Sequence, residues 1–434
     1  MELTKGTKKI INALKSAGYD GYAVGGFVRN LLLGIPVQDV DVTTSATPEQ
    51  MLEVFKDFKV YKTGLKHGTL TVNSLGENIE VTTYRVDGEY LDNRHPNGVT
   101  FVTSLSEDLK RRDFTVNAMA LSEEGVIDLF GGKEDLKNKV IRAVGNPDKR
   151  FQEDALRILR ALRFASVLDF EIESETALAI ERNKSLLKNV SVERIFSEFS
   201  KMLTGKGVER VLTSHKSVIF EIIPELSKCD GFLQNSIYHA YDVYTHTVKS
   251  VANAEQNRYV RWALLLHDIE KPSTYTIDEK GGHFYTHQQK GAITAEKILR
   301  RLKADNKLIA TCYELIRLHD VKTEISRGEM KKMLSNHGEE TVLLLAKVKV
   351  GDALAHAKPY SDLRRASTDK FYALAVSVIE SKECYKLKDL NVNGNDLKAR
   401  GYKGGEIKTK LQFLLNEVMF DRIKNEKQEL LKHL

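Results

Sequence analysis

The alternation of apolar and polar positions predicts two differently built parts in this 434-residue chain. In the first part, short apolar runs alternate with helical patterns and with turn signals, which is typical of an α/β domain. From residue 146 onward, the apolar residues recur mostly at helical spacing. The pattern therefore predicts an α/β head with a mixed β-sheet, followed by all-α regions.

A turn at Gly25 and Gly26 carries the first chemical signal. The stretch GYAVGGFVRNLLLG (21–34) reads as a strand, this turn and an apolar helix over Val28–Leu33. Two adjacent glycines let the backbone bend tightly and let a ligand approach the amides. The helix that follows offers its N-terminus to an anion. The segment is therefore a candidate phosphate-binding turn.

Paired carboxylates follow this helix. Asp39 and Asp41 alternate with Val40, so in a strand both project from one face and can hold a divalent metal between them. Glu80, in the second of two strands expected between residues 59 and 85, is a candidate third carboxylate. Each of these acids could instead be a solvated strand residue. Together with the glycine turn, they favour metal-assisted phosphoryl transfer.

A polar loop and a basic segment complete the first part. The loop DGEYLDNRHPNGV (87–99) lacks periodicity, and such loops can gate catalysis. After it, Arg111 and Arg112 could neutralise a triphosphate, while Asp113 and Asn117 could bind sugar hydroxyls. The alternative for this segment is a salt-bridged helix end.

Composition narrows the class of protein. No apolar run is long enough to span a membrane, and the N-terminal segment predicts an amphipathic helix without signal-peptide features. Three widely spaced cysteines fit a reducing compartment, so we expect a cytoplasmic protein. A net charge of +6 is compatible with a nucleic-acid partner.

The ordered series of motifs resembles the bacterial tRNA nucleotidyltransferases, the CCA-adding enzymes, which are class II members of the polymerase-beta superfamily. The motifs that carry the resemblance are GGFVRN (25–30), DVD (39–41), RRDFTVNAMA (111–120), DLFGGKEDL (128–136), RFQEDALRILRALRF (150–164) and SVERIFSEFSKML (191–203). Their order and spacing are far more specific than any one of them alone.

The resemblance implies roles for the head residues. Asp39 and Asp41 would hold magnesium, with Glu80 as a helper. Phosphate and sugar contacts would come from Gly25, Gly26, Arg29, Arg111, Arg112, Asp113 and Asn117. The chain departs from the family at Asn30, where an aspartate is usual, so a metal or arginine contact made by that acid would be weakened.

The resemblance also assigns base selection to the segment that begins at Asp154. On one helix, Asp154 and Arg157 would share a face, with Arg160 and Arg163 further along. In the family this face pairs with the edge of C or A, so that G and U find no matching partners. An intrahelical Asp154–Arg157 salt bridge explains the spacing equally well.

A second set of chemical residues follows from about residue 225 and resembles an HD-type phosphohydrolase domain. The implied metal ligands are His246, His267, Asp268 and Asp352, and His287 and His319 would be further ligands or phosphate contacts. Glu270 departs from this family, where glycine is common. The alternative is a helical tRNA-binding body whose histidines only make structural hydrogen bonds.

The predicted organisation has four parts: a catalytic head (1–145), a base-recognition neck (146–223), a body with the HD-type site (224–355) and a tRNA-binding tail (356–434). The implied function is magnesium-dependent addition of CCA to tRNA from CTP and ATP, with a second divalent metal in the HD-type site. Rival functions are CC addition, A addition, poly(A) synthesis, RNA binding without catalysis, and phosphohydrolysis. A full-length loop, with Arg85, Asp87, Glu89 and Arg94, favours full CCA addition.

Overall fold

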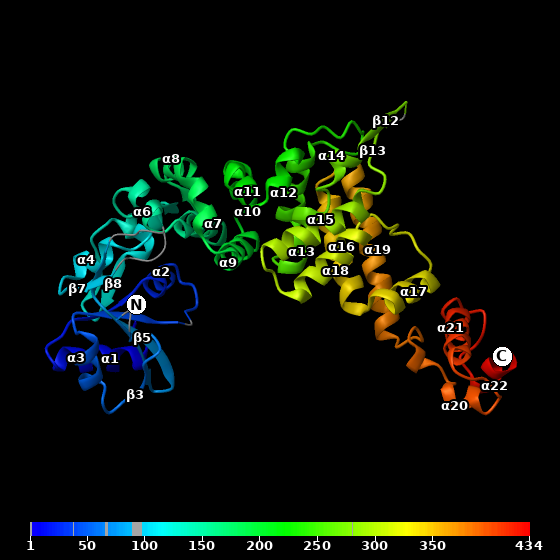
Figure 1. Cartoon of the computed structure of the whole chain (residues 1–434), viewed down its shortest axis with the longest axis horizontal. Helices are drawn as coiled ribbons and strands as arrows, with labels where there is room; N and C mark the ends of the chain where they lie inside the picture. Colours follow the sequence, from blue (N-terminus) through cyan, green and yellow to red (C-terminus); the bar gives the residue numbers. More distant parts are fainter. Residues whose placement is uncertain (1, 38, 66–67, 89–97, 280) are drawn as a thin grey trace. The chain divides into compact units, whose positions relative to one another are not determined.

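The chain, in a computed structural model, is described over residues 2–37, 39–65, 68–88, 98–279 and 281–434. It divides into two compact units, Met1–Ile222 and Ile223–Leu434. Figure 1 colours unit 1 from blue to green and unit 2 from green to red. The finer division into head, neck, body and tail stays a prediction.

Unit 1 is built on a seven-stranded mixed sheet among the described residues, which confirms the predicted α/β head. The strand order is β3-β4-β5-β2-β1-β8-β9. The strands are β1 (Gly21–Val24), β2 (Asp41–Thr44), β3 (Lys59–Tyr61), β4 (Thr69–Ser74), β5 (Glu77–Thr83), β8 (Met119–Ser122) and β9 (Gly125–Asp128). Segment 59–85 thus holds three full strands, where the sequence pattern predicted two.

The pairing of β2 with β5 is parallel, whereas the other neighbouring pairs in this sheet are antiparallel. Its register places Asp41 opposite Glu80. Two carboxylates from distant segments are therefore brought side by side at one position of the sheet.

Helices cover this sheet and continue beyond it. They are α1 (Lys5–Ser16), α2 (Gly26–Leu32), α3 (Pro48–Val54), α4 (Leu105–Lys110), α5 (Gly132–Lys137), α6 (Pro147–Glu153), α7 (Leu156–Leu168), α8 (Ser174–Asn183), α9 (Val192–Leu203), α10 (Val208–Ser214) and α11 (Lys216–Ile222). Short 3₁₀ turns are η2 (Thr115–Asn117) and η3 (Lys184–Asn189). Two small ladders join β6 (Arg85–Asp87) to β7 (Val99–Phe101) and β10 (Val140–Ile141) to β11 (Glu171–Ile172).

The N-terminal helix illustrates how local sequence sets an element. The hydroxyl of Thr4 caps α1 by accepting from the amide of Thr7, and Ile10, Ile11 and Leu14 form its buried stripe. Helix α1 packs on β1 and β4. Burial of each of these three side chains stabilises the fold by roughly 1.5–3 kcal/mol, which holds α1 on the sheet.

Unit 2 is mainly helical. Its helices are α12 (Val243–Asn253), α13 (Arg258–Leu266), α14 (Lys271–Thr274), α15 (His287–Arg301), α16 (Asn306–Leu318), α17 (Arg327–His337), α18 (Glu339–Leu354), α19 (Tyr360–Glu380), α20 (Gly394–Lys398), α21 (Gly405–Met419) and α22 (Lys427–Lys432). Short 3₁₀ turns are η4 (Pro224–Cys229) and η5 (Leu387–Asp389). A short hairpin of β12 (Thr276–Asp278) and β13 (Gly281–His283) interrupts the predicted all-α pattern.

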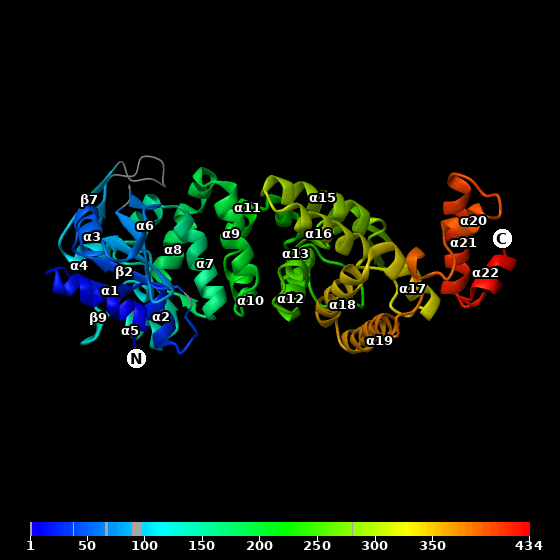
Figure 2. The same cartoon turned by 90° about the horizontal axis from the view of Figure 1, so that it is seen from below.

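Side-chain caps fix where the central helices of unit 2 begin. Asp242 caps α12, Asn257 caps α13 and Asp305 caps α16, each by accepting from backbone amides of the first turn. Helix α13 packs against α12, α16 and α18, and α15 runs beside α16, as Figure 2 shows. The fully buried Trp262 of α13 lies in this core.

Two further predictions from composition can be compared with the structure. Within the described residues, no helix combines the length and apolar character needed to cross a bilayer. Cys229, Cys312 and Cys384 carry free thiols, and burial raises the pKa of Cys229 to about 12, which makes that thiol unreactive.

Candidate functional sites

A polar cavity of about 600 Å³ in unit 1 gathers the residues that the sequence predicted for nucleotide binding. Both paired acids also line it, whereas Glu80 does not. The lining consists of Gly25, Gly26, Arg29, Asp39, Asp41, Arg111, Arg112, Asp113, Asn117, Asp154, Arg157, Arg160, Arg163 and Phe164. Six arginines face four aspartates here, so the cavity suits a polyanion.

The three predicted carboxylates do not all lie where the pattern placed them. Asp41 begins β2, but Asp39 precedes the strand instead of belonging to it. Partial burial and the negative charges of Glu80 and Asp39 together raise the pKa of Asp41. A divalent cation would relieve this repulsion, and carboxylate oxygens are ligands that Mg²⁺ prefers. The residues present therefore fit a magnesium site.

The glycine turn lies directly against the cavity. Gly25 has φ +71°, and a Cβ at this position would lie 3.2 Å from Nη1 of Arg112. Helix α2 begins at Gly26, two residues earlier than predicted. A side chain at position 25 would therefore be strained and would crowd Arg112, which explains the glycine locally.

Arg29 is held in a fixed orientation at the cavity wall. Its Nη1 donates to Oδ1 of Asn117 at 2.6 Å, while Nε and Nη2 donate to Oδ1 of Asn30 at 3.1 and 2.9 Å. The ring of Phe164 lies 4.8 Å from the guanidinium carbon. Asn30 thus orients the arginine through a neutral amide, where the usual aspartate would add a charge. Burial and the nearby Arg163 lower the pKa of Arg29 to about 10, so it stays charged at neutral pH.

Asp113 is a buried connecting group. Its Oδ2 accepts from Nε and Nη2 of Arg160 at 2.8 and 2.6 Å, and its Oδ1 accepts from the side chain of Asn117 and the amide of Phe114. Although burial opposes ionisation, Arg160 and Asn117 bring the pKa of Asp113 down to about 2. The carboxylate therefore holds Arg160 and Asn117 in place.

The helix predicted through Asp154 and Arg157 is broken. Helix α6 ends at Glu153, and Asp154 has an extended backbone before α7 begins at Leu156. Asp154 pairs with Arg194 at 3.0 Å and Arg157 with Glu153 at 2.7 Å, so the intrahelical Asp154–Arg157 bridge does not form. Both side chains still line the cavity.

Arg157 and Arg163 have structural partners that the sequence did not reveal. The guanidinium of Arg157 also donates to the carbonyls of Arg111 and Arg150, at 3.0 and 3.2 Å. Arg163 pairs with Glu198 of α9 and lies over the ring of Phe164. Phe164 meets three guanidinium groups in all, from Arg29, Arg160 and Arg163. Its position next to Arg163 in the RALRF run was the signal available for it.

Asp108 is a further residue that sequence reasoning missed. It is fully buried and accepts from Arg111 at 2.7 and 3.0 Å, from Arg112 at 3.2 Å and from the hydroxyl of Thr43. Despite burial, both arginines lower its pKa. Asp108 therefore orients the two arginines toward the cavity, and its place three and four residues before them was the available signal.

Replacing Asp108 by alanine is expected to destabilise the protein and to weaken nucleotide binding. Removing one partner from a buried ionic cluster costs about 2–4 kcal/mol here, because Arg111 and Arg112 retain some solvent access. Chemical denaturation measures the stability and calorimetry measures CTP affinity. The exposed neighbour Glu107, changed to alanine, is the control, and equal behaviour of the two variants would contradict the role of Asp108.

Unit 2 contains a buried histidine and aspartate cluster, which we call the histidine centre. His246, His267, Asp268 and Asp352 converge there from α12, the end of α13, the residue after it and α18. Nε2 of His246 lies 2.9 Å from Asp352, and Nε2 of His267 lies 3.2 Å from Asp268. All four predicted ligands are thus brought together.

The second nitrogen of each ring is held by the backbone. Nδ1 of His267 lies 2.7 Å from the carbonyl of Leu264, and Nδ1 of His287 and of His319 each lie 2.6 Å from a carbonyl. A carbonyl can only accept, so Nδ1 carries a proton, and in a neutral ring Nε2 keeps its lone pair. Although burial opposes it, Asp268 and Asp352 raise the pKa of His267 to about 10, so a cation bound here would replace the Nε2 proton of that ring. Backbone support of this kind is typical of metal-ligating histidines.

His287 and His319 extend the histidine centre on the other side of Asp268. Their Nε2 atoms lie 3.5 and 3.7 Å from Oδ1 of Asp268, whereas His246 and His267 approach Oδ2. The two Nε2 atoms are 3.2 Å apart. Burial and His267 lower the pKa of His319 to about 3, so its imidazole is neutral. Among the described residues, the donor set fits one or two divalent cations, which Asp268 would help to hold.

The structure adds two residues to the histidine centre and shows how Glu270 is accommodated where the HD-type family commonly has glycine. His356 lies 3.7 Å from Asp352, and Lys271 lies 2.7 Å from Asp268; neither was predicted. Glu270, found where glycine is common, has φ −99° and its carboxylate accepts from Thr294 at 2.6 Å. An ordinary backbone angle needs no glycine here, so Glu270 does not distort the turn.

The predicted polar loop lies only partly within the described residues. Strand β6 contains Arg85 and Asp87, the first residue of the loop. Glu89 and Arg94 lie outside the described residues. The assignment of the loop as full length therefore stays a prediction.

Comparison with known proteins places both units in context. Three family models match: "Poly A polymerase head domain" at residues 21–142, "Probable RNA and SrmB- binding site of polymerase A" at 169–229, and domain 2 of tRNA nucleotidyltransferase at 284–434. A CCA-adding enzyme of Pediococcus pentosaceus is 46% identical over 60% of this chain and 64% of its own length. One from Bacillus cereus is 35% identical over 92% of this chain and 89% of its own length. The crystal structure of Bacillus stearothermophilus CCA-adding enzyme in complex with CTP superimposes with a TM-score of 0.71 and 32% identity, covering 99% of this chain and 97% of that one.

Proposed function

Because the chain belongs to the family of CCA-adding enzymes, we propose that it adds C, C and A to the 3′ end of tRNA, using CTP and ATP. The observation that supports this best is the cavity of unit 1, which combines the glycine turn, the paired acids, six arginines and Asp154. CTP is bound by the Bacillus stearothermophilus relative, and tRNA is named by the family model over residues 284–434. The cysteines, all free, fit a reducing cytoplasmic setting.

In the proposed reaction, the 3′-hydroxyl oxygen of tRNA forms a bond to the α-phosphorus of the nucleotide. The bond from that phosphorus to the bridging oxygen breaks, and pyrophosphate leaves. Asp39 and Asp41 would hold magnesium, with Glu80 supporting Asp41. Magnesium, when bound, supplies positive charge that favours the ionised hydroxyl and stabilises the departing pyrophosphate.

Groups around the glycine turn would bind the triphosphate. The missing side chains at Gly25 and Gly26 leave room for phosphate beside Arg29 and Arg112. Arg111 and Arg112 are already oriented by Asp108, so they lose little freedom when a phosphate binds. Charge neutralisation and positioning are then the main contributions of the protein.

Ribose recognition is proposed for Asn117 and not directly for Asp113. Both carboxylate oxygens of Asp113 are occupied by Arg160, Asn117 and a backbone amide. The side-chain nitrogen of Asn117 uses one N–H on Asp113, and an amide nitrogen has two. The remaining N–H can donate to a ribose hydroxyl.

Base selection is proposed for Asp154 and Arg157, with Arg160 and Arg163 shaping the same wall. A cytosine or adenine edge offers an amino donor to a carboxylate and a ring acceptor to a guanidinium. Arg194 holds the side chain of Asp154, and Glu153 holds that of Arg157. The hydrogen-bonding groups that these contacts leave over therefore point in fixed directions. Guanine or uracil would leave these polar groups unpaired, which can give large discrimination.

Extension of tRNA transcripts tests this proposal. Transcripts ending at the discriminator base, after C, or after CC are incubated with magnesium and each labelled nucleotide. The proposal requires all three to end at CCA with CTP and ATP alone. Stopping at CC, adding only the last A, or making long A tails would instead identify the corresponding relative. No incorporation by folded protein would favour the RNA-binding or phosphohydrolase alternatives.

A second function is proposed for the histidine centre: binding of a divalent metal, with phosphohydrolase activity. It rests on the Nε2 atoms that converge on Asp268 and Asp352, while the Nδ1 atoms of His267, His287 and His319 face backbone carbonyls. His246, His267, Asp268 and Asp352 would hold one cation, and Asp268, His287 and His319 a second. A bound cation would supply positive charge to a phosphate and lower the pKa of a bound water.

Replacing His267 by alanine is expected to weaken metal binding on the order of 100-fold or more, because a buried ligand is lost between two carboxylates. Calorimetry with Mn²⁺ or Ni²⁺ on chelator-treated protein measures the affinity. His337, which contacts Glu314 away from this centre, is the matched control. Unchanged metal affinity in the His267 variant would favour the purely structural alternative.

A further inference from the structure

Arg29 differs from the other arginines that line the cavity of unit 1. Each of the others pairs with a carboxylate, and the pairs are Arg111–Asp108, Arg112–Asp108, Arg157–Glu153, Arg160–Asp113 and Arg163–Glu198. Among the described residues, Arg29 makes no ion pair, although only 9% of its surface is exposed. Burial of a charge without an opposite charge is costly, so other groups must hold this guanidinium.

Three neutral side chains surround Arg29 instead. Asn30 and Asn117 accept hydrogen bonds from its guanidinium, and the guanidinium carbon lies over the ring of Phe164, 4.8 Å from its centre. An amide oxygen carries no net charge, and the face of an aromatic ring attracts a cation through its quadrupole alone. We call Asn30, Asn117 and Phe164 the neutral clamp. It fixes the position of Arg29 and leaves its charge intact.

The ring of Phe164 is itself held by packing. It is 5% exposed and lies edge to face with the fully buried Phe114, the two ring centres being 5.8 Å apart. Glycines aside, the other described residues that line the cavity all carry charged or amide groups. The ring is therefore a rigid apolar surface within a polar wall, and a cation can rest against it.

Repulsion from neighbouring arginines makes the contacts of Arg29 more important. Arg160 and Arg163 also lie over the ring of Phe164, at 5.4 and 3.9 Å from its centre. After burial, the charge of Arg163 contributes most to lowering the pKa of Arg29, and Arg160 adds to it. These two arginines have carboxylate partners, whereas Arg29 has only the neutral clamp. Arg29 therefore keeps a positive charge that no paired carboxylate neutralises.

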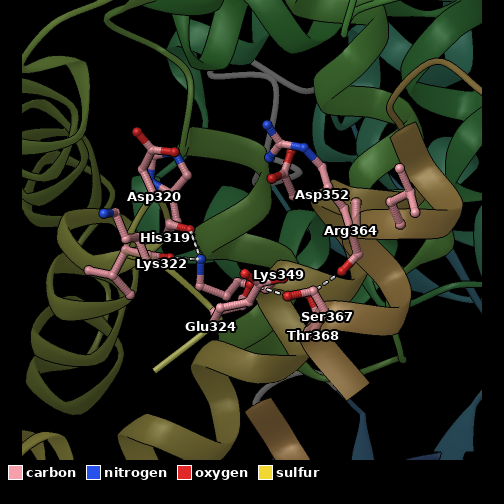
Figure 3. A pocket seen from close by; sticks show the side chains of 13 residues that line it. His319, Asp320, Lys322, Glu324, Lys349, Asp352, Arg364, Ser367 and Thr368 are labelled. Carbon is pink, nitrogen blue, oxygen red and sulfur yellow. Dashed lines mark hydrogen bonds between the residues drawn. The ribbon is translucent and has the colours of Figure 1, made fainter. Parts of the chain in front are cut away.

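Neutral partners alone do not make a buried cation a binding group. Lys349 of unit 2 is also buried, and it donates to the carbonyls of His319 and Val321 at 2.6 and 2.5 Å (Figure 3). That ammonium joins the segment after α16 to α18, which is a structural role.

The surroundings of Arg29 are different, because its guanidinium borders the glycine turn. A Cβ at Gly26 would lie 3.5 Å from Nη2 of Arg29, so the missing side chain leaves room beside this nitrogen. The clamp uses one N–H on each guanidinium nitrogen, and both terminal nitrogens therefore keep a second N–H. Free N–H groups and an uncancelled charge suit a phosphate.

We propose that the neutral clamp is a positioning device for the triphosphate of the incoming nucleotide. It holds Arg29 in place despite the repulsion of Arg160 and Arg163, and it leaves the whole charge of Arg29 to the phosphates. This rests on the nucleotide addition proposed above. Asn30 and Phe164 are positioning residues, since they act through Arg29. The clamp sets the affinity for CTP and ATP alike, whereas the choice of base belongs to Asp154 and Arg157.

Asn30→Asp tests whether the neutrality of the clamp matters. Aspartate has the shape of asparagine and accepts the same hydrogen bonds from Arg29, but it adds a negative charge. We expect this variant to bind CTP and inorganic tripolyphosphate at least about fivefold more weakly, because the added charge opposes the phosphates. Calorimetry without magnesium measures both affinities. The control is Asn12→Asp, at an exposed residue outside the cavity lining, which should change either affinity by less than about twofold.

Fluorinated phenylalanines at position 164 test the ring. Fluorine withdraws electron density from the face of the ring while its shape stays nearly the same, so packing on Phe114 is retained. We expect CTP affinity to fall stepwise with one, two and three fluorines, by at least about fivefold with three. Phe164→Leu, which has no ring, should weaken CTP binding at least as much. All variants should keep the preference for CTP and ATP over GTP and UTP, and circular dichroism checks their folding.

Unchanged or tighter binding of CTP by Asn30→Asp would overturn the proposal, because a purely structural arginine gains from an added carboxylate. Equal affinity across the fluorinated series would exclude the ring from the clamp. An altered base preference would show that these residues shape the base site instead. A wild-type protein that binds CTP but adds no nucleotide to tRNA would contradict the proposed function, and the measured affinities would still decide for or against the clamp.

Discussion

Changing both Asp39 and Asp41 to alanine is expected to abolish nucleotide addition to tRNA, with a rate loss of about 1,000-fold or more. These acids line the cavity, and the pKa of Asp41 is already raised by burial and by the nearby charges of Glu80 and Asp39. Losing a metal that provides about 4 kcal/mol of charge stabilisation corresponds to roughly this factor. Single-turnover extension of a transcript ending in CC, with labelled ATP, measures the loss.

The control is Asp57→Ala, since Asp57 is exposed and is not among the residues that line the cavity. CTP binding without magnesium should persist in the double variant, because the arginines and Asn117 remain. Normal extension by the double variant would rule out the paired acids as the catalytic metal site. Activity lost together with CTP binding and with the folded structure would show only a structural role.

Changing Asp154 to asparagine is expected to lower CTP and ATP incorporation by about 100-fold and to reduce their advantage over GTP and UTP. The amide adds a donor where the base offers its own amino group, so a matched pair becomes a mismatched one. Sites built around a polar partner discriminate strongly against its absence. Steady-state incorporation of each of the four nucleotides on a transcript lacking CCA measures the change.

Arg194→Ala separates base recognition from support of the local fold. Asp154 pairs with Arg194 at 3.0 Å, so a purely structural aspartate would give both variants the same phenotype. If Asp154 reads the base, Arg194→Ala should lower the rate while keeping the preference for CTP and ATP. An unchanged nucleotide preference in Asp154→Asn would exclude Asp154 from base selection.

The amino-acid sequence predicted which residues gather in the cavity of unit 1 because its signals are local. A glycine pair before a helix, two acids two residues apart and an arginine pair can each be read within a few residues. The α/β character of the head follows from the period-2 and helical patterns in the same way. All eleven residues predicted for nucleotide binding then line one cavity.

Predictions from local periodicity were wrong where tertiary contacts compete with the local pattern. The spacing of Asp154 and Arg157 is helical, yet the chain breaks between α6 and α7, where Asp154 turns to Arg194 and Arg157 turns to Glu153 and to two carbonyls. A buried guanidinium gains more from carboxylate and carbonyl partners than from an exposed helical pair worth a few tenths of a kcal/mol. Asp39 likewise precedes β2, although its alternation with Asp41 is that of a strand.

The histidine centre shows most clearly what the sequence determined and what only the tertiary structure decided. The sequence determined which residue types are available and that the segments carrying them are mainly helical. Only the tertiary structure decided that the two oxygens of Asp268 face two different histidine pairs and that His356 and Lys271 join them. The physical reason is that these distances depend on how α12, α13, α15, α16 and α18 pack, and these helices are spread over residues 243–354. Helical periodicity sets which face of each helix is buried, but the partner of that face is fixed only when the whole core is packed.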